Sequence, residues 1–341
     1  MHGLPDTEVP VRLLVQCRQV YSYALAARRG WHGEAHKLTV EAFASMIRDY
    51  HRPDGRAGWV FSIHRDGSVA DARRDLYSHA FVLLAAGSYV QATGDRSGLS
   101  IADDTLAFLD AEMRARHGGY LEGSPAGNAP RRQNPHMHLF EGLLTLWSST
   151  KDSQYLTRAE AMFELFATRF FLPEPGVLCE YFDDGLNPAA GELGRIVEPG
   201  HHYEWIWLLR WYERETGRSV QRYVDGLYRH ADKYGYDNAG MVVDEALIDG
   251  SHRLPSHRTW PMTEALKANI VEAAAGRERA SERAVALANT LLGRFLTPEP
   301  AGGWIDRLDE HGRPATDVMP ASTLYHVMCA IDELDRFAIA A

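Results

Sequence analysis

The stretch Glu198-Pro199-Gly200-His201-His202-Tyr203-Glu204-Trp205 has the pattern of a helix start that carries chemistry. Pro199 suits the first helical position, where a backbone amide would have no partner. His201 and Glu204 lie three residues apart and share a helix face, whereas His202 points about 100° away, toward packing. The helix start disfavours an imidazolium, while Glu204 favours one. We therefore predict that His201 is a proton acceptor near neutral pH.

Similar helix starts recur along the chain. Prolines that open apolar runs stand at positions 10, 135, 199, 261 and 320, so the last three steps are 64, 62 and 59 residues, and the first, 125, is about twice as long. The missing start is expected at Leu76, with Asp75 as its cap. Five starts follow a strand-like piece, at residues 58–61, 119–122, 176–180, 240–244 and 303–306. This spacing predicts a repeating unit of two helices and a hairpin.

The composition is that of an acidic globular chain. Its 341 residues are 45% hydrophobic and 24% charged, with a net charge of −10. A chain of this size can bury a large core, and the repeat favours one closed domain over residues 1–341. This net negative charge gives no sign of the basic surface that binds nucleic acid or an anionic membrane. We expect neither of these partners, and a monomer or homodimer.

Cysteine usage and hydropathy predict the compartment. Cys17, Cys179 and Cys329 are widely spaced and odd in number, which indicates buried thiols in a reducing environment. No run reaches the roughly 18 apolar residues of a membrane span, and the N-terminus lacks a signal pattern. The expected location is the cytoplasm.

Two residues near the first helix starts are candidate ligands of a small molecule. Arg18 lies among apolar residues of a helix expected over residues 9–29. A buried arginine needs a partner, so Arg18 forms a structural ion pair or donates to sugar hydroxyls or to an enediolate oxygen. Tyr77, in the first turn of the next inner helix, either donates to a ligand or packs with a wet hydroxyl.

The next start, Asn134-Pro135-His136-Met137-His138, repeats the histidine pattern. We expect Asn134 to cap the helix and to lie near the ligand, with Pro135 in the first position. His138 shares a face with Glu141 and is either a ligand or a core histidine. His136 projects about 200° from His138, so the two are a poor metal pair.

Five residues in the second half complete the candidate set. Arg195, in the long connection 182–197, either reaches over the site or is a solvated charge. Trp260 offers a flat face for a sugar ring, and Trp304 lies in the last hairpin. Glu264 projects one turn inside its helix, with an ion pair to Lys267 as the alternative. His326, about two turns into an apolar helix, occupies the place in the series opposite His201.

Four motifs together resemble the N-acylglucosamine 2-epimerase superfamily, particularly its mannose isomerase branch. They are RQNPHMHLFE at 132–141, EPGHHYEWIWLL at 198–209, RTWPMTEALKA at 258–268 and PASTLYHV at 320–327. The resemblance implies an all-α (α/α)6 barrel whose inner helices bring their motif ends to one pocket. The family has twelve helices, whereas this chain supplies about eleven. Outer helices are expected over about 34–51, 103–116, 154–171 and 220–234, and the first outer helix is lacking, so we expect a truncated start or a different closure.

The resemblance also implies residue roles. Two histidines exchange the proton in this family, at the positions of His201 and His326. Arg18, His138 and Glu204 match positions that hold the sugar and orient the base. Trp260 and Glu264 match a tryptophan-proline motif near the pocket.

These roles predict an isomerase that interconverts a free aldose and its ketose, with mannose and fructose preferred. One histidine takes the C2 proton to give a cis-enediol, and return of a proton to C1 gives the ketose. Protonation of C2 from the opposite face by the second histidine would give the 2-epimer instead. We expect no cofactor and no metal, since a phosphate-binding glycine loop and a convincing metal-ligand pattern are both lacking.

Three alternatives stay open. The first is a 2-epimerase of the mannose/glucose, N-acylglucosamine or cellobiose type. The second is a glycoside hydrolase on the same fold, with Glu204 and Glu264 as its carboxylate pair. The third is a sugar- or partner-binding protein that has kept the pocket without activity, because fold alone does not decide function.

Overall fold

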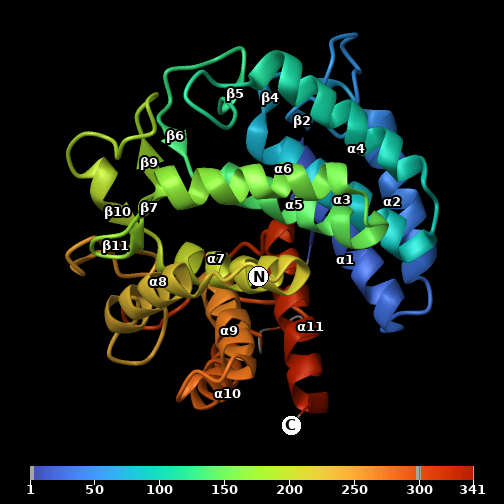
Figure 1. Cartoon of the computed structure of the whole chain (residues 1–341). Coiled ribbons are helices and arrows are strands. Elements are labelled where there is room, and N and C mark those ends of the chain that lie inside the picture. Colours follow the sequence, from blue (N-terminus) through green and yellow to red (C-terminus); the bar gives the residue numbers. More distant parts are fainter. Residues whose placement is uncertain (1–3, 297–298, 300, 341) are drawn as a thin grey trace. The chain divides into compact units, whose positions relative to one another are not determined.

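The structure is a computed structural model that describes residues 4–296, 299 and 301–340. The chain divides into two compact units. The N-terminal unit comprises Pro5–Thr168 and Phe182–Asn187, and the C-terminal unit comprises Met1–Leu4, Arg169–Tyr181 and Pro188–Ala341. Both are built mainly from helices (Figure 1).

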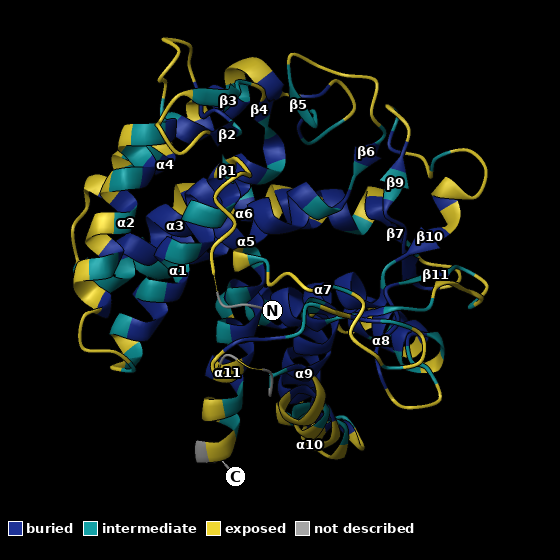
Figure 2. Cartoon of the chain, turned by 180° about the vertical axis from the view of Figure 1, so that it is seen from behind, coloured by how far each residue is buried: buried dark blue, intermediate teal, exposed yellow. Residues whose placement is uncertain are grey.

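The N-terminal unit has three inner helices, each with an outer partner. The inner helices are α1 (Leu13–Arg29), α3 (Leu76–Thr93) and α5 (Asn134–Thr150), and α3 packs between the other two. The outer helices α2 (Ala35–Tyr50), α4 (Ser97–Phe108) and α6 (Ser153–Leu165) pack on α1, α3 and α5. One π-helical turn extends α4 (Leu109–Met113) and another extends α6 (Phe166–Phe170). The dark blue of α3 and α5 in Figure 2 shows that they are buried along most of their length.

The C-terminal unit repeats this arrangement. Its inner helices are α7 (Pro199–Thr216), α9 (Thr259–Ala274) and α11 (Leu324–Ala340), and α9 packs against both α7 and α11. The outer helices α8 (Gln221–Tyr234) and α10 (Ala280–Thr290) pack on α7 and α9, and the π-helical turn Leu291–Phe295 follows α10. A 3-10 turn, Ala321–Thr323, precedes α11. The described residues thus contain eleven α-helices, which confirms the number predicted from the repeat.

Short antiparallel strands connect these helices. In the N-terminal unit β1 (Val11–Arg12), β2 (Ser62–Ile63) and β3 (Val69–Asp71) pair in that order, and β4 (Arg74–Asp75) pairs with β5 (Gly123–Ser124). In the C-terminal unit the paired sets are β7 (Phe171–Leu172) with β8 (Val177–Leu178), β10 (Ile196–Val197) with β11 (Glu245–Leu247) and β12 (His252–Leu254), and β13 (His257–Arg258) with β14 (Arg307–Leu308). The remaining strands are β6 (Arg131–Arg132) and β9 (Tyr181–Phe182). The 3-10 turn Leu193–Arg195 precedes β10.

Several predicted boundaries are confirmed or corrected. Pro199 is the first residue of α7, and the Asp75 carboxylate caps α3 by accepting from Ser78 N at 2.8 Å. The first helix starts at Leu13 rather than near residue 9, because residues 11–12 pair with β2 in an extended form. The prediction that Asn134 caps α5 is wrong, since Asn134 is already helical and Gln133 takes the cap position.

Side chains at the inner-helix starts accept amide hydrogens from the strand-like pieces. His79 Nε2 accepts from Trp59 N at 3.2 Å, and His136 Nε2 accepts from Tyr120 N at 3.0 Å. His202 Nε2 lies 3.2 Å from Leu178 N, so His202 serves packing as predicted. In the next two repeats a methionine sulfur takes this place, with Met262 beside Val242 N and Met319 beside Trp304 N.

Gly118 and Gly119 follow the π-helical turn that extends α4 and ends at Met113. Gly119 has φ +62°, and a Cβ there would lie 2.5 Å from His136 Nε2. Glycine at this position therefore lets the ring reach the backbone.

Two further features concern thiols and hydropathy. The three cysteines are buried and unbridged, as predicted. Within the described residues, the helices lack the combination of length and hydropathy that a membrane crossing requires.

Candidate functional site

The C-terminal unit brings five predicted site residues into one group. His201 and Glu204 come from the first turns of α7, Trp260 and Glu264 from α9, and His326 from α11. The ring centres of His201 and His326 lie 4.9 and 5.7 Å from the ring centres of the same indole, that of Trp260. We call these five residues the histidine cluster.

His201 is held by two carboxylates that the sequence analysis did not assign. Its Nδ1 lies 2.9 Å from Glu180 Oε2 and 3.8 Å from Glu198 Oε2. Burial is the largest single influence and disfavours the imidazolium, but the Glu180 and Glu198 carboxylates outweigh it and raise the pKa of His201 to about 9. These carboxylates thus favour the imidazolium of His201, whereas the sequence predicted a neutral base. Both of these carboxylate contacts are made through Nδ1 rather than Nε2.

His326 is oriented by a carboxylate of the neighbouring helix. Its Nδ1 lies 2.8 Å from Glu264 Oε1, while Glu264 Oε2 lies 2.7 Å from Lys267 Nζ. The predicted alternative for Glu264, an ion pair with Lys267, is thus present together with the contact to His326. The side chains of Glu264 and Lys267 are both fully buried. Since such an arrangement fixes the ring, His326 presents Nε2 away from its carboxylate.

Arg258 connects the His201 side of the cluster to the strands before α9. Its guanidinium contacts Glu198 at 3.1 Å and buried Asp244 at 2.9 Å, and its central carbon lies 5.1 Å from the Trp260 ring centre. Burial raises the pKa of Glu198, while the positive charges of His201 and Arg258 lower it. Of the two carboxylates at His201, Glu198 therefore also contacts Arg258.

Two sets of donor atoms in this unit have the composition of a metal site. They are Glu180 with Glu198 and His201, and Glu204 with Glu264 and His326, and within each set the atoms lie within 4.8 Å of one another. Each set already pairs with a cation of the protein, Arg258 in the first and Lys267 in the second. The geometry therefore fits an internal ion-pair network, and the absence of a metal stays a prediction.

The N-terminal unit brings together a second group of predicted residues. Arg18 of α1 donates to Tyr77 Oη at 2.9 Å, and its guanidinium carbon lies 4.4 Å from the Phe81 ring centre. His138 of α5 contacts Glu141 through Nδ1 at 2.9 Å and packs edge-on against the Tyr77 ring. The group offers guanidinium, phenol and imidazole on three inner helices, which suits recognition of hydroxyl groups.

The other predicted residues lie outside these two groups of contacts. Asn134 is in the first turn of α5, and its Oδ1 is buried without a hydrogen-bond partner. Arg195 forms an exposed ion pair with Asp249 at 2.5 Å, which matches its alternative as a solvated charge. Trp304 is buried beside Met319 in the last repeat. Their roles in binding stay predictions.

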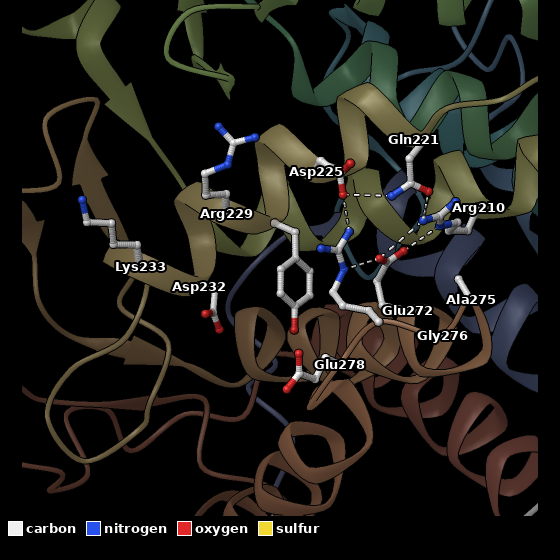
Figure 3. Close-up of a pocket in the computed structure, with 12 residues that line it drawn as sticks. Arg210, Gln221, Asp225, Arg229, Asp232, Lys233, Glu272, Ala275, Gly276 and Glu278 are labelled. Atoms are coloured by element: carbon white, nitrogen blue, oxygen red, sulfur yellow. Dashed lines mark hydrogen bonds and ion pairs between the residues drawn. The ribbon is translucent and has the colours of Figure 1, made fainter.

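A separate pocket of about 710 Å³ lies at the other end of α7 and α9 in the C-terminal unit (Figure 3). Arg210 and Glu272 line it, nine and eight residues after His201 and Glu264, or about 12–13 Å along the helices. Glu272 contacts Arg210 at 2.6 Å and Arg277 at 2.5 Å, and Arg277 also contacts Asp225. These paired charges are a structural network remote from the histidines.

Comparisons with known proteins agree with the motifs. Residues 1–330 match the family model described as N-acylglucosamine 2-epimerase. The chain is 36% identical to mannose-6-phosphate isomerase of Rhizobium meliloti (strain 1021), over 98% of this chain and 88% of the relative. It is 26% identical to D-mannose isomerase of Thermobifida fusca, over 90% of this chain and 83% of the relative.

A solved structure shows the same fold. The crystal structure of a D-mannose isomerase superposes with a TM-score of 0.86 at 21% identity, covering 96% of this chain and 87% of the other. The chain thus has the all-α (α/α)6 fold that the motifs imply.

Proposed function

Because the chain belongs to the N-acylglucosamine 2-epimerase family, whose members similar to it are isomerases and epimerases, we propose that it is an enzyme that interconverts free mannose and fructose. The observation that carries this proposal is the pair of buried histidines, each tied through Nδ1 to a carboxylate and both packed on Trp260. Two fixed imidazoles beside a flat aromatic face suit proton transfer on an open-chain sugar.

The charges beside the two rings suggest that His326 accepts a proton and His201 donates one. His326 Nε2 takes the C2 proton of the open-chain aldose, and the electron pair forms the C1–C2 double bond. The carbonyl oxygen at C1 takes the proton of His201 Nε2, which gives a neutral cis-enediol. His326 then returns its proton to C1, while the O2 hydroxyl gives its proton back to His201. The product is the ketose, and both rings return to their starting state.

The remaining predicted residues complete this proposal as ligands. We assign Arg18, Tyr77 and His138 to sugar oxygens, because they combine charged and neutral donors on inner helices. Glu204 lies with Glu264 and His326 and is proposed to orient the sugar or the base. The activity of residues 1–341 as one domain, the cytoplasmic location and a monomer or homodimer stay predictions.

The local charges favour a neutral sugar over a phosphorylated one. The carboxylates of Glu180 and Glu198 lie at His201, and that of Glu264 lies at His326. The cations Arg258 and Lys267 are each paired with one of these carboxylates. A dianionic phosphate beside such a cluster would meet repulsion, so we prefer free mannose although one relative bears the name of the 6-phosphate.

Proton NMR in deuterium oxide tests the proposal directly. The purified chain is incubated with mannose or with mannose 6-phosphate, beside the variants His201→Asn, His326→Asn and, as control, His311→Gln. His311 is an exposed histidine of the same unit. We expect fructose with solvent deuterium at C1 and a loss of at least about 100-fold in both site variants.

Other outcomes would replace this proposal. Glucose as the first product would make the protein a 2-epimerase, and faster turnover of mannose 6-phosphate would make the phosphorylated sugar its substrate. A new reducing end from a glycoside, without exchange on free sugars, would indicate a hydrolase. Sugar binding without any exchange would indicate a non-catalytic binding protein.

A further inference from the structure

Lys267 is a buried lysine that contacts Glu264, the member of the histidine cluster that orients His326. Its Nζ lies 2.7 Å from Glu264 Oε2, and the other oxygen of that carboxylate lies 2.8 Å from His326 Nδ1. The lysine ammonium also lies 3.9 Å from the ring centre of Trp207 on α7, whose indole nitrogen donates to Glu333 of α11. Three inner helices therefore hold Lys267 in place.

The groups that face His326 come from all three of these helices. Helix α9 contributes Glu264, with Lys267 behind it, and the neutral ring of Trp260. Helix α7 contributes Glu204, a carboxylate oxygen of which lies within 4.8 Å of the ligand atoms of Glu264 and His326. Helix α11 contributes the neighbouring phenol ring of Tyr325. Two carboxylates and one ammonium thus act on the imidazole.

His201 has a different balance of charge. Two carboxylates lie within 4 Å of its Nδ1, and the cation behind one of them, Arg258, is shared with a further carboxylate, Asp244. Glu264 is instead neutralised by a lysine that makes its ion pair with Glu264 itself. Without Lys267, His326 would face two carboxylates and would resemble His201 in its surroundings.

We propose that Lys267 is a positioning residue that neutralises Glu264, so that Glu264 orients His326 without drawing a proton onto it. Glu264 alone would fix the ring and also stabilise its imidazolium, which cannot accept a proton from carbon. The ammonium on the far oxygen removes most of that electrostatic effect and keeps the hydrogen bond. This inference rests on the proposed function, because it explains how one of two similar histidines stays a base.

The test is the pH dependence of kcat/KM for mannose in Lys267→Met, a variant of similar shape without the charge. We expect the rising limb of the profile to move upward by about one pH unit, with a roughly tenfold loss of kcat/KM below that limb. KM should change much less than kcat. The control is Lys233→Met, which removes an exposed lysine of α8 and should leave the profile unchanged.

A second pair of variants measures the effect of Lys267 on the pH profile when the Glu264 carboxylate is absent. In Glu264→Gln the negative charge next to His326 Nδ1 is removed while the Lys267 ammonium stays, so the rising limb should move to lower pH than in the wild type. Adding Lys267→Met to that variant should move the limb upward again. The pair keeps the test decisive if Lys267→Met alone does not fold.

Titration of the His326 ring by nitrogen-15 NMR separates this inference from the proposed function. Its resonance is assigned by its loss in His326→Asn, and its midpoint should rise in Lys267→Met even in a protein that turns over no sugar. An unmoved midpoint and an unmoved kinetic limb in folded Lys267→Met, or identical profiles in the second pair, would overturn the role of Lys267. A wild-type chain inactive on every sugar would overturn the function alone.

Discussion

The two histidines of the cluster differ at the scale of single residues, although both are buried and both pack on Trp260. His201 lies between the carboxylates of Glu180 and Glu198, whereas the carboxylate at His326 is shared with Lys267. In the proposed mechanism the same residue type therefore serves as proton donor at one position and as proton acceptor at the other. The identity of the neighbours sets this difference more than the helix position does, because both rings lie near the start of an inner helix.

The raised pKa of His201 has a consequence for stability. An unfolded histidine has a pKa near 6.5, and burial opposed by the stronger effect of Glu180 and Glu198 raises the folded value to about 9. The native state therefore holds a proton that the unfolded state loses above pH 6.5. The stabilisation is fully present below pH 6.5 and is lost as the pH rises through about 9, amounting to about 3 kcal/mol at most.

Urea unfolding at pH 6 and at pH 9.5 measures this loss. We expect the free energy of unfolding of the wild type to fall between these pH values, and that of His201→Gln to fall by clearly less. His311→Gln, which changes an exposed histidine, should behave as the wild type does. Equal slopes in the wild type and in His201→Gln would show that the carboxylates do not hold a proton on this ring.

At the scale of elements, the two ends of α7 and of α9 carry different groups of residues. The starts of α7 and α9 carry the histidine cluster, and their later turns carry Arg210 and Glu272 (Figure 3). Glu272 is buried and receives Arg210 from α7 and Arg277 from the turn after α9. This carboxylate fixes the spacing of two helices whose opposite ends hold the candidate site.

Glu272→Ala should therefore lower stability without changing chemistry. Removing the carboxylate takes one of two short ion pairs from the Arg210 guanidinium, which is only 8% exposed and still contacts Glu213 at 2.6 Å, so a loss of about 1–3 kcal/mol is expected. Chemical unfolding measures the loss, and kcat/KM of the folded variant should stay within about twofold. Glu278→Ala, at an exposed residue of the same pocket, is the control. A large loss of kcat/KM with unchanged stability would contradict this account.

The sequence was informative wherever the signal is local. Helix periodicity, the Asp75 cap and Pro199 at the first position of α7 depend on residues a few positions apart, and they were predicted. The face shared by His138 and Glu141 follows from the same spacing. The start of α1 was placed too early because strand pairing with residues about 50 positions away decides it.

The partners of His201 show where the prediction stopped. Glu180 precedes His201 by 21 residues, so helical spacing does not relate them. Glu198 lies three residues before His201, yet its position ahead of Pro199 is read as a helix cap. A carboxylate that ends four of the five strand-like pieces was the available signal. Spacing within the helix therefore did not predict the carboxylates that surround His201, while the choice of His201 came from the motif.

At the scale of the whole molecule, one type of hydrogen bond recurs in the repeats of both units. A backbone amide of a strand-like piece donates to a side chain at the start of the following inner helix, as in Trp59 to His79 and Tyr120 to His136. A neutral imidazole accepts such a hydrogen bond, whereas an imidazolium cannot. The connection between strand-like piece and helix thus depends on unprotonated histidines at successive positions of the chain.

These buried rings should make the protein sensitive to acid. Burial lowers the pKa of His79 and of His136 to about 4 and that of His202 to about 3, against 6.5 in the unfolded chain. Below pH 6.5 these histidines bind protons in the unfolded state but stay unprotonated in the native state. The free energy of unfolding should therefore fall from pH 6.5 toward pH 4, by at most about 3 kcal/mol for each ring.

The variant His79→Gln tests the device away from the histidine cluster, because a glutamine oxygen accepts the amide hydrogen of Trp59 at any pH. We expect His79→Gln to be less stable than the wild type at pH 7, where the ring fits its site, and to lose less stability between pH 6.5 and pH 4.5. His64→Gln, at an exposed histidine of the same unit, should keep the full wild-type loss. If His79→Gln and the wild type lost stability in parallel over this range, the acid sensitivity would have to come from the carboxylate ion pairs instead.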